Sequence, residues 1–225
     1  MLASASREYD EAVQAAPRRV VVDGFLSRAE VNLLRGAAAR ALAAMFGAEP
    51  TGDAATDASL PLLAPGLAAP ELLGDRAASL AHDIADRAAS TARGHGFGSE
   101  LGIAGSLLSR LRAPRCGAVE FNPTGSELGV HGYWAPHVDK ANVESYDVSA
   151  VMYLASAGEH FEGGEFAFID ETADRLVEAR AGRLLLFDSE DDQRGALHNL
   201  HQVRPVVGEG QRLALSVWFT RGEGG

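Results

Sequence analysis

Three residues of this sequence, His137, Asp139 and His201, have the types and spacing that a catalytic iron(II) ion requires. Two imidazoles and one carboxylate occupy three positions of an octahedron and leave three positions open for reacting molecules. His137 and Asp139 are two residues apart, and residues i and i+2 of a strand point to the same side, so both can reach one ion. About sixty residues separate His201 from this pair, so the fold must bring two remote strands together.

His198 competes with His201 for the third ligand position. We expect His198 in a loop, because it follows the small residues Gly195 and Ala196. His201 begins a segment that runs on to Val203 as a strand, and a strand end in the core is the better place for a ligand. We therefore select His201. An H-x-D pattern alone arises often by chance, so the surrounding residues decide the interpretation.

Arg212 is the next candidate, because it begins the apolar segment 212–220, where an unpaired guanidinium would be costly to bury. That segment contains no acid, and arginine can grip a carboxylate through two parallel hydrogen bonds. A dicarboxylate ligand is one explanation, and an ion pair with one of the chain's many acids is the other. The residues alone leave both open. We expect Tyr153 and Ser216 to donate hydrogen bonds into the same cavity, with ordinary packing in the β-core as the alternative.

The elements that must position these residues change character along the chain. The segment before residue 115 is rich in alanine and helical in period. A helix is expected from Ser27, with Glu30 as its capping partner, to Gly47, and a second helix over 70–92. A short strand is expected at 20–22. The segments 48–70 and 94–105 are expected as loops, and a short apolar element follows at 107–111.

From Cys116 onward the apolar period becomes two, which is typical of strands. The expected strands are 119–121, 148–154, 165–169, 176–178, 183–187, 202–206 and 212–220. Many short strands indicate a sandwich or barrel, and helices followed by strands indicate an α+β fold with the helices packed on one sheet. We therefore predict a single domain over 1–225, with a helical support region at 1–115 and a β-core with the metal site at 116–221.

Composition excludes several classes of function. The chain has 225 residues, 46% apolar and 23% charged, with a net charge of −11, which is typical of one globular domain. The acidic balance disfavours nucleic acids and anionic lipid as partners. The single cysteine, Cys116, allows no internal disulfide, and neither a leader-like nor a membrane-spanning apolar stretch occurs. We expect a cytoplasmic protein without a membrane segment.

The strand-rich half resembles the iron(II)- and 2-oxoglutarate-dependent dioxygenases of the prolyl 4-hydroxylase type. The resemblance covers roughly residues 117–220, nearly half the chain, and the order and spacing of its motifs make it specific. The motifs are, in chain order, His137-x-Asp139, Tyr153-Leu154, Phe161-x-Gly163-Gly164-x-x-x-Phe168, Gly182-Arg-Leu-Leu-Leu-Phe187-x-Ser189, His201-x-Val203-x-Pro205-Val206 and Gly210-x-Arg212-x-Ala214-Leu-Ser216-Val-Trp218-Phe219.

The resemblance implies a double-stranded β-helix, or jelly roll, of about eight strands. It also implies roles for single residues. His137, Asp139 and His201 match the iron ligands. Arg212 matches the residue that binds the distal carboxylate of 2-oxoglutarate, and Tyr153 and Ser216 match positions that hydrogen-bond that carboxylate.

Three aromatic residues are substrate-binding candidates by the same resemblance. Trp218 matches an aromatic residue near the cosubstrate pocket. Phe121 stands where relatives commonly have a tyrosine, so one hydroxyl to the cosubstrate is absent here. Trp134 lies in a segment, 123–136, that is longer than in close prolyl hydroxylases and is a candidate lid or substrate wall.

The function implied by the resemblance is hydroxylation of an unactivated C–H bond with release of succinate and CO2. The implied cofactors are Fe(II), 2-oxoglutarate and O2, with ascorbate as a further candidate. The expected substrate is a prolyl or other amino-acid residue of a peptide, or a small molecule. The alternative is a jelly-roll binding module that holds a metal without turnover.

Overall fold

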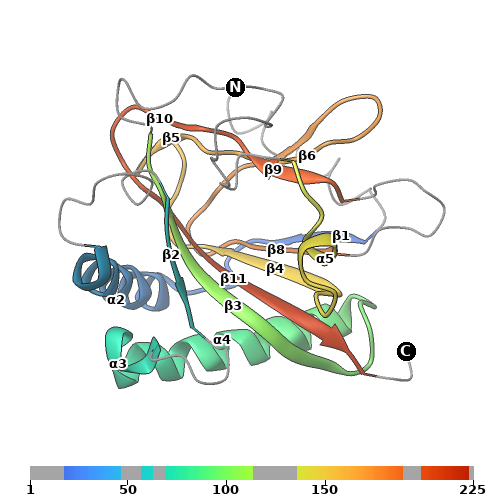
Figure 1. Cartoon of the computed structure of the whole chain (residues 1–225), viewed down its shortest axis with the longest axis horizontal. Helices are drawn as coiled ribbons and strands as arrows, with labels where there is room; N and C mark the ends of the chain where they lie inside the picture. The colour runs from blue at the N-terminus through green and yellow to red at the C-terminus, as the bar shows by residue number, and fades with distance from the viewer. Residues whose placement is uncertain (1–17, 47–56, 63–68, 114–135, 190–198, 223–225) are drawn as a thin grey trace.

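The computed structural model describes residues 18–46, 57–62, 69–113, 136–189 and 199–222 (Figure 1). The helices are α2 (Arg28–Phe46), α3 (Ala69–Leu73), α4 (Asp75–Gly94) and α5 (Asp139–Asn142). The strands are β1 (Arg19–Val22), β2 (Asp57–Pro61), β3 (Leu101–Leu111), β4 (Val148–Tyr153), β5 (Glu162–Gly163), β6 (Phe166–Phe168), β7 (Arg175–Val177), β8 (Leu184–Asp188), β9 (His201–Val203), β10 (Val206–Val207) and β11 (Arg212–Arg221).

Within the described residues, the strands form one large sheet and two small ones. The large sheet has six strands in the order β1-β8-β4-β11-β3-β2, and β7-β6-β9 and β10-β5 form the others. Every neighbouring pair is antiparallel. In Figure 1 the small sheets lie across from the large one, while α2, α3 and α4 lie on its opposite side. The predicted α+β arrangement, with helices packed on one sheet, is confirmed.

The capping box predicted at the start of the first long helix is present in the structure. The Ser27 backbone N–H donates to Glu30 Oε2 at 2.7 Å, and the Glu30 N–H donates to Ser27 Oγ at 3.3 Å. These reciprocal bonds satisfy two donors that a helix N-terminus leaves unpaired. Met45, in the last turn of this helix, is 46% exposed.

The helix predicted over 70–92 is divided into α3 and α4 at Gly74. Gly74 has a φ of 79°, a left-handed conformation that glycine adopts without strain and that interrupts a helix. After this break, α4 buries a stripe of small side chains, namely Ala77, Ala81, Ala85, Ala88 and Ala92, together with Ile84. Small side chains let the helix lie close to its neighbours, and α4 contacts both α2 and β3.

Apart from the two-residue β5, the strands from β4 onward fall close to their predicted positions, but β2 and residues 101–105 of β3 lie where loops were expected. β3 runs from Leu101 to Leu111 and pairs with β11 on one side and β2 on the other. Gly102 and Gly105 made this segment look like a break. Gly105 in fact faces a crowded neighbour, since a Cβ there would come within 2.8 Å of the Tyr146 hydroxyl. Glycine in a strand often marks such a close approach.

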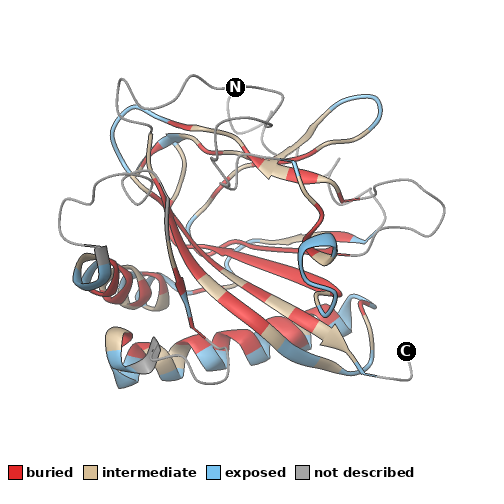
Figure 2. Ribbon diagram, in the orientation of Figure 1, coloured by how far each residue is buried: buried red, intermediate tan, exposed pale blue. Residues whose placement is uncertain are grey.

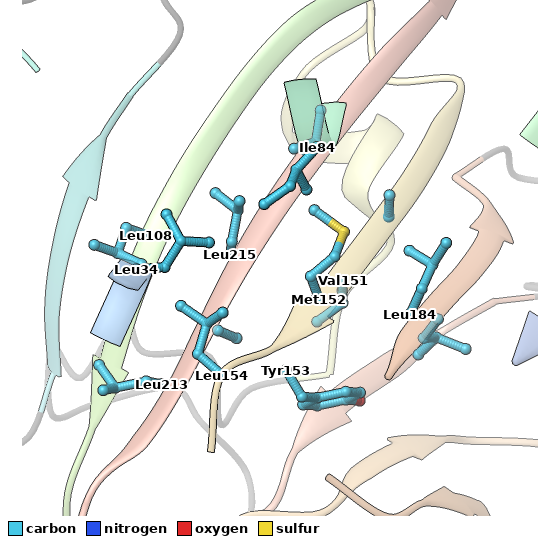
Figure 3. Packing of buried hydrophobic residues seen from close by; sticks show 14 of the residues in the cluster. Leu34, Ile84, Leu108, Val151, Met152, Tyr153, Leu154, Leu184, Leu213 and Leu215 are labelled. Carbon is cyan, nitrogen blue, oxygen red and sulfur yellow. The ribbon is translucent and has the colours of Figure 1, made fainter. Parts of the chain in front are cut away.

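The large sheet has two faces with different surroundings. Leu213, Leu215, Val217 and Phe219 of β11 are buried. Figure 3 shows Leu34 of α2 and Ile84 of α4 among the buried side chains of β3, β11 and β4. Figure 2 shows the buried residues running along the inner strands and the inward sides of the helices. Alternation along β11 therefore leaves its other residues, beginning with Arg212, for the opposite face.

A truncation in this helix-facing layer should be costly. We expect Leu215→Ala to lower the free energy of unfolding by about 2–5 kcal/mol, because a buried leucine leaves a cavity that the packed core refills only in part. Val207→Ala is the control, since Val207 is 49% exposed against 1% for Leu215, and it should cost about 0.5 kcal/mol or less. Guanidinium unfolding of both variants measures the difference, and equal losses would contradict the layer described here.

The amino-terminal half of the chain contributes to the same sheet as the rest. β1, β2 and β3 come from before residue 115. β1 pairs with β8, β2 pairs with β3, and β3 pairs with β11. The domain over 1–225, with its division at 115, stays a prediction. None of the helices in the described part of the chain is long and apolar enough to span a bilayer.

Candidate metal centre

The structure brings His137, Asp139 and His201 together, as their residue types suggested. His137 and His201 form an antiparallel β-bridge, with the His137 N–H donating to the His201 carbonyl at 2.9 Å and the reverse bond at 3.0 Å. Asp139 follows as the first residue of α5. Its Oδ1 lies 3.4 Å from His137 Nε2 and 3.7 Å from His201 Nε2. The bridge thus joins the two remote segments and places three potential ligand atoms within 4.8 Å of one another.

Asp139 presents its two carboxylate oxygens to different partners. Oδ1 faces the two imidazoles, while Oδ2 accepts hydrogen bonds from Ser149 Oγ at 2.5 Å and Trp218 Nε1 at 3.0 Å. Burial alone would raise the pKa of Asp139, but the interactions with His137, His201 and Ser149 hold this pKa well below its usual value. The carboxylate is therefore ionised, with Oδ2 fixed by donors and Oδ1 directed at the imidazoles.

His201 is buried among aromatic rings. Its ring stacks on Phe166 at a centroid distance of 4.9 Å and meets the edge of Phe187 at 5.0 Å. Burial lowers the pKa of His201 to about 4, although the nearby Asp139 carboxylate acts to raise it. The imidazole is neutral at physiological pH. Its Nδ1–H donates to the Asn199 carbonyl at 2.8 Å, so the lone pair is on Nε2, which faces Asp139.

This donor set fits a transition-metal ion with nitrogen and oxygen preference. Neutral imidazoles and an ionised carboxylate are the protonation states that a metal requires. A ligating histidine normally donates its other ring N–H to a carbonyl or carboxylate, as His201 does. Two histidines and one carboxylate are typical of iron(II) sites with open positions. Within the part of the chain that the structure describes, this is the one group of side chains with such an arrangement.

Arg212 lies in the same pocket as the three candidate ligands. The pocket is lined by His137, Asp139, His201, Arg212, Ser216, Trp218, Ser109, Val151, Phe166, Phe187 and Val203. Arg212 is 3% exposed, its Nε donates to the Gly164 carbonyl at 3.0 Å, and its guanidinium carbon lies 5.4 Å from the centre of the Tyr153 ring. A buried cation beside a potential metal site fits an anionic ligand that reaches both.

Glycine at position 164 leaves room for the Arg212 side chain. Gly164 has a φ of +66°, and a Cβ there would come 3.1 Å from Arg212 Cδ and 2.9 Å from the Phe161 ring. A larger residue would be strained in this conformation and would press on both neighbours. The Gly163-Gly164 pair therefore lets its chain pass close beside the guanidinium.

The two hydrogen-bond donors predicted beside Arg212 lie differently. Ser216 lines the pocket, as expected. Tyr153 is fully buried on the same sheet face and contacts the Arg212 guanidinium with its ring, but it is not among the residues that line the described pocket. The roles of both residues toward a cosubstrate stay predictions.

Of the three aromatic candidates for substrate contact, only Trp218 is described by the structure. Its indole N–H donates to Asp139, and its ring stacks on Tyr146 at 4.7 Å with an interplanar angle of 5°. Trp218 therefore supports a candidate ligand as well as lining the pocket. Phe121 and Trp134 lie outside the described residues, as does His198.

Sequence reasoning missed several residues that support the ligands. Ser149 bonds Asp139 and lies 2.5 Å from Ser189 Oγ, with both serines buried. Asn199 accepts the His201 N–H through its backbone, and its side chain accepts a hydrogen bond from Arg19. Polar residues in the middle of apolar strands were the available signal for Ser149, since such residues need partners when buried. Nothing in the sequence pairs Arg19 with Asn199, which is 180 residues away.

Removing the indole donor should weaken metal binding. We expect Trp218→Phe to reduce Co²⁺ affinity by about 10- to 100-fold, because residues that orient a metal ligand typically contribute that much. Calorimetric titration of the metal-free protein measures the change. Tyr146→Phe is the control, because it retains the ring stacked on Trp218 and leaves the bond to Asp139 in place. Unchanged affinity in Trp218→Phe would contradict this role.

Residues 124–220 match the 2OG-Fe(II) oxygenase superfamily. Over 88 residues the chain is 43% identical to 2-oxoglutarate and iron-dependent oxygenase domain-containing protein 3 of Xenopus tropicalis, covering 39% of this chain and 26% of that protein. The protein of the same name from Mus musculus is 35% identical over 119 residues, covering 53% of this chain and 35% of that protein. The chain thus matches about a third or less of the length of these curated relatives.

Solved structures share the fold over nearly the whole chain. The viral collagen prolyl hydroxylase of Paramecium Bursaria Chlorella virus-1, in complex with 2OG, has a TM-score of 0.60 at 15% identity and covers 94% of this chain and 99% of that one. A prolyl hydroxylase from Trichoplax adhaerens, in complex with a peptide fragment, has a TM-score of 0.61 at 16% identity and covers 97% and 91%. The predicted jelly-roll core is confirmed. From the superfamily match and these relatives, the region from residue 124 to residue 220 belongs to the 2OG-Fe(II) oxygenase superfamily.

Proposed function

We propose that this chain is an Fe(II)- and 2-oxoglutarate-dependent dioxygenase that hydroxylates an unactivated C–H bond and releases succinate and CO2. One observation carries the proposal: a single pocket is lined both by the His137, Asp139 and His201 cluster and by the buried cation of Arg212. A module that only stored a metal would need the first group and not the second.

His137, Asp139 and His201 would hold the iron. When bound, the iron together with 2-oxoglutarate and O2 supplies the oxidising power for the reaction. The protein contributes the protonation states that make binding possible, namely the neutral imidazole of His201 and the ionised carboxylate of Asp139. Ser149 and Trp218 hold the carboxylate through Oδ2, which favours ligation through Oδ1.

Arg212 and the apolar wall would position and protect the cosubstrate. The guanidinium would bind the carboxylate of 2-oxoglutarate that is remote from the metal, with the Ser216 hydroxyl as a second donor. The wall formed by Val151, Phe166 and Phe187 lines the same pocket. Apolar side chains at this place exclude water and strengthen the charge interactions within the site.

We propose a prolyl or other amino-acid residue of a peptide as the first substrate class to test, with small molecules second. The proposal is supported by the fold shared with the viral collagen prolyl hydroxylase and with the Trichoplax adhaerens enzyme, whose structure contains a hypoxia inducible factor oxygen degradation domain peptide fragment. The net charge of −11 supports neutral or basic substrates over nucleic acids.

The test is succinate formation by the purified chain with Fe(II), 2-oxoglutarate, O2 and ascorbate as reductant. Peptides with and without proline are offered as substrates, and mass spectrometry detects the gain of one oxygen, about 16 Da. Omission of 2-oxoglutarate is the control. We expect succinate and the hydroxylated product to appear together. Stoichiometric metal binding without succinate from any substrate would favour the binding-module alternative.

A further inference from the structure

Arg19 is a buried cation at the start of β1. It is far in sequence from the candidate ligands His137, Asp139 and His201 but is linked to His201 in space. The residue is 5% exposed and pairs in register with Phe187 of β8. Its Nε donates to Asn199 Oδ1 at 2.7 Å. Its two terminal nitrogens donate to the two carboxylate oxygens of Asp170 at 2.9 and 2.7 Å. One planar guanidinium thus holds two partners from different segments in a fixed geometry.

The Asn199 side chain is held on both sides. Its Oδ1 accepts the bond from Arg19, and its Nδ2 donates to the Asp188 carbonyl at 2.8 Å. The backbone carbonyl of the same residue accepts the Nδ1–H of His201 at 2.8 Å. Fixing the asparagine therefore fixes the acceptor that sets both the tautomer and the ring orientation of His201.

Arg19 is itself rigid. Its guanidinium carbon lies 3.9 Å from the centre of the Phe168 ring, within the range of a cation–π contact. A buried arginine with both a bidentate carboxylate and an aromatic face beneath it has few alternative rotamers. Phe168 in turn lies opposite His201 in the β6–β9 pair. The Arg19 contacts and the His201 ligand thus share one small part of the sheet.

We infer that Arg19 is a positioning residue for His201, acting through Asn199. This inference rests on the proposed metal site, and it extends that site to the first described strand of the chain. It assigns to β1 a function beyond completing the edge of the large sheet. The competing interpretation is a purely structural ion pair between Arg19 and Asp170, which would stabilise the fold without affecting the metal ligand.

Cobalt(II) titration of the metal-free chain separates the two interpretations. We expect Arg19→Gln to weaken Co²⁺ binding by about 10- to 100-fold and to change the visible absorption of the bound Co²⁺, because outer partners of ligands have effects of that size. Arg175→Gln is the matched control. Its Nε lies 3.8 Å from the same Asp170 carboxylate, and the variant should bind Co²⁺ as the unmodified chain does.

A second pair of variants tests the path through Asn199. Asn199→Ala should weaken Co²⁺ binding to a similar extent, and the double variant Arg19→Gln/Asn199→Ala should lose no more than the larger single loss, since both remove one interaction. Arg19→Lys retains the charge without the planar fork and should also weaken binding, which gives a second readout should Arg19→Gln fail to fold.

The outcomes are distinct. Co²⁺ affinity and spectrum unchanged in Arg19→Gln or Arg19→Lys, or single losses that multiply in the double variant, would overturn the inference and leave the metal site standing. An unmodified chain that binds no Co²⁺ would overturn the proposed site and this inference together. Melting temperatures of the metal-free variants are measured as well. If the Arg19–Asp170 ion pair were purely structural, its loss would lower the melting temperature without changing Co²⁺ affinity.

Discussion

Replacing Asp139 with alanine is expected to lower 2-oxoglutarate turnover by about 100-fold or more. Partners in the outer shell of a metal site typically contribute 10- to 100-fold, and loss of a direct ligand should cost at least as much. Asp139 is also the only carboxylate in the group formed with His137 and His201, so the variant leaves two imidazoles. Succinate formation measures turnover, and Co²⁺ titration measures metal affinity. Both turnover and metal affinity should fall in this variant.

Asp86→Ala is the control for this variant. Asp86 is an exposed residue of α4, on the side of the large sheet away from the pocket, and its removal should change neither readout. Full turnover in Asp139→Ala would contradict the ligand assignment. Loss of turnover with retained Co²⁺ affinity would instead show that the carboxylate acts on the reaction without holding the metal.

Replacing Arg212 with glutamine is expected to weaken 2-oxoglutarate binding by about 100-fold, within the 2–5 kcal/mol that truncating one partner of a buried charge pair costs. Metal affinity should change little, because the contacts described for Arg212 are with the Gly164 carbonyl and the Tyr153 ring. Calorimetric titration of 2-oxoglutarate into the metal-loaded protein without O2 measures this effect separately from turnover.

The control is Arg204→Gln, which removes a guanidinium that is 40% exposed and paired with Asp174. It should leave 2-oxoglutarate affinity unchanged. Arg212→Lys is informative as well, since it retains a positive charge but loses the fork and the bond from Nε to the Gly164 carbonyl. Unchanged 2-oxoglutarate affinity in Arg212→Gln would refute the anchoring role and favour a structural one.

The sequence was sufficient to predict that His137, Asp139 and His201 lie together, because part of the pattern is local. The spacing of His137 and Asp139 suggested that they converge, although Asp139 begins α5 and does not continue a strand, and His201 is distinguished by starting a strand. Most strands from β4 to β11 were also predicted, from short apolar runs bounded by turn residues, although β4, β6 and β8 are buried along their whole length and show no alternation of burial. Arg212 was identifiable as a cation that an apolar strand would bury.

The sequence also misled where local propensity and tertiary context disagree. Gly102 and Gly105 suggested a break, yet they lie in the long strand β3, where pairing with β11 outweighs the low strand propensity of glycine. The helix over 70–92 was recognised, but the break at Gly74 depends on a left-handed backbone conformation that periodicity does not reveal.

What the sequence alone determined is the set of residues available for chemistry: a His, Asp, His set of candidate ligands, an arginine in an apolar strand and a strand-rich half to hold them. The tertiary structure decided how that chemistry is held. Only the sheet order places Trp218 of β11 against Asp139 and brings Arg19 to Asn199 across 180 residues. Such contacts depend on which strands become neighbours. The strand order is decided by how the whole sheet buries its apolar side chains, and residues adjacent in the chain do not reveal it.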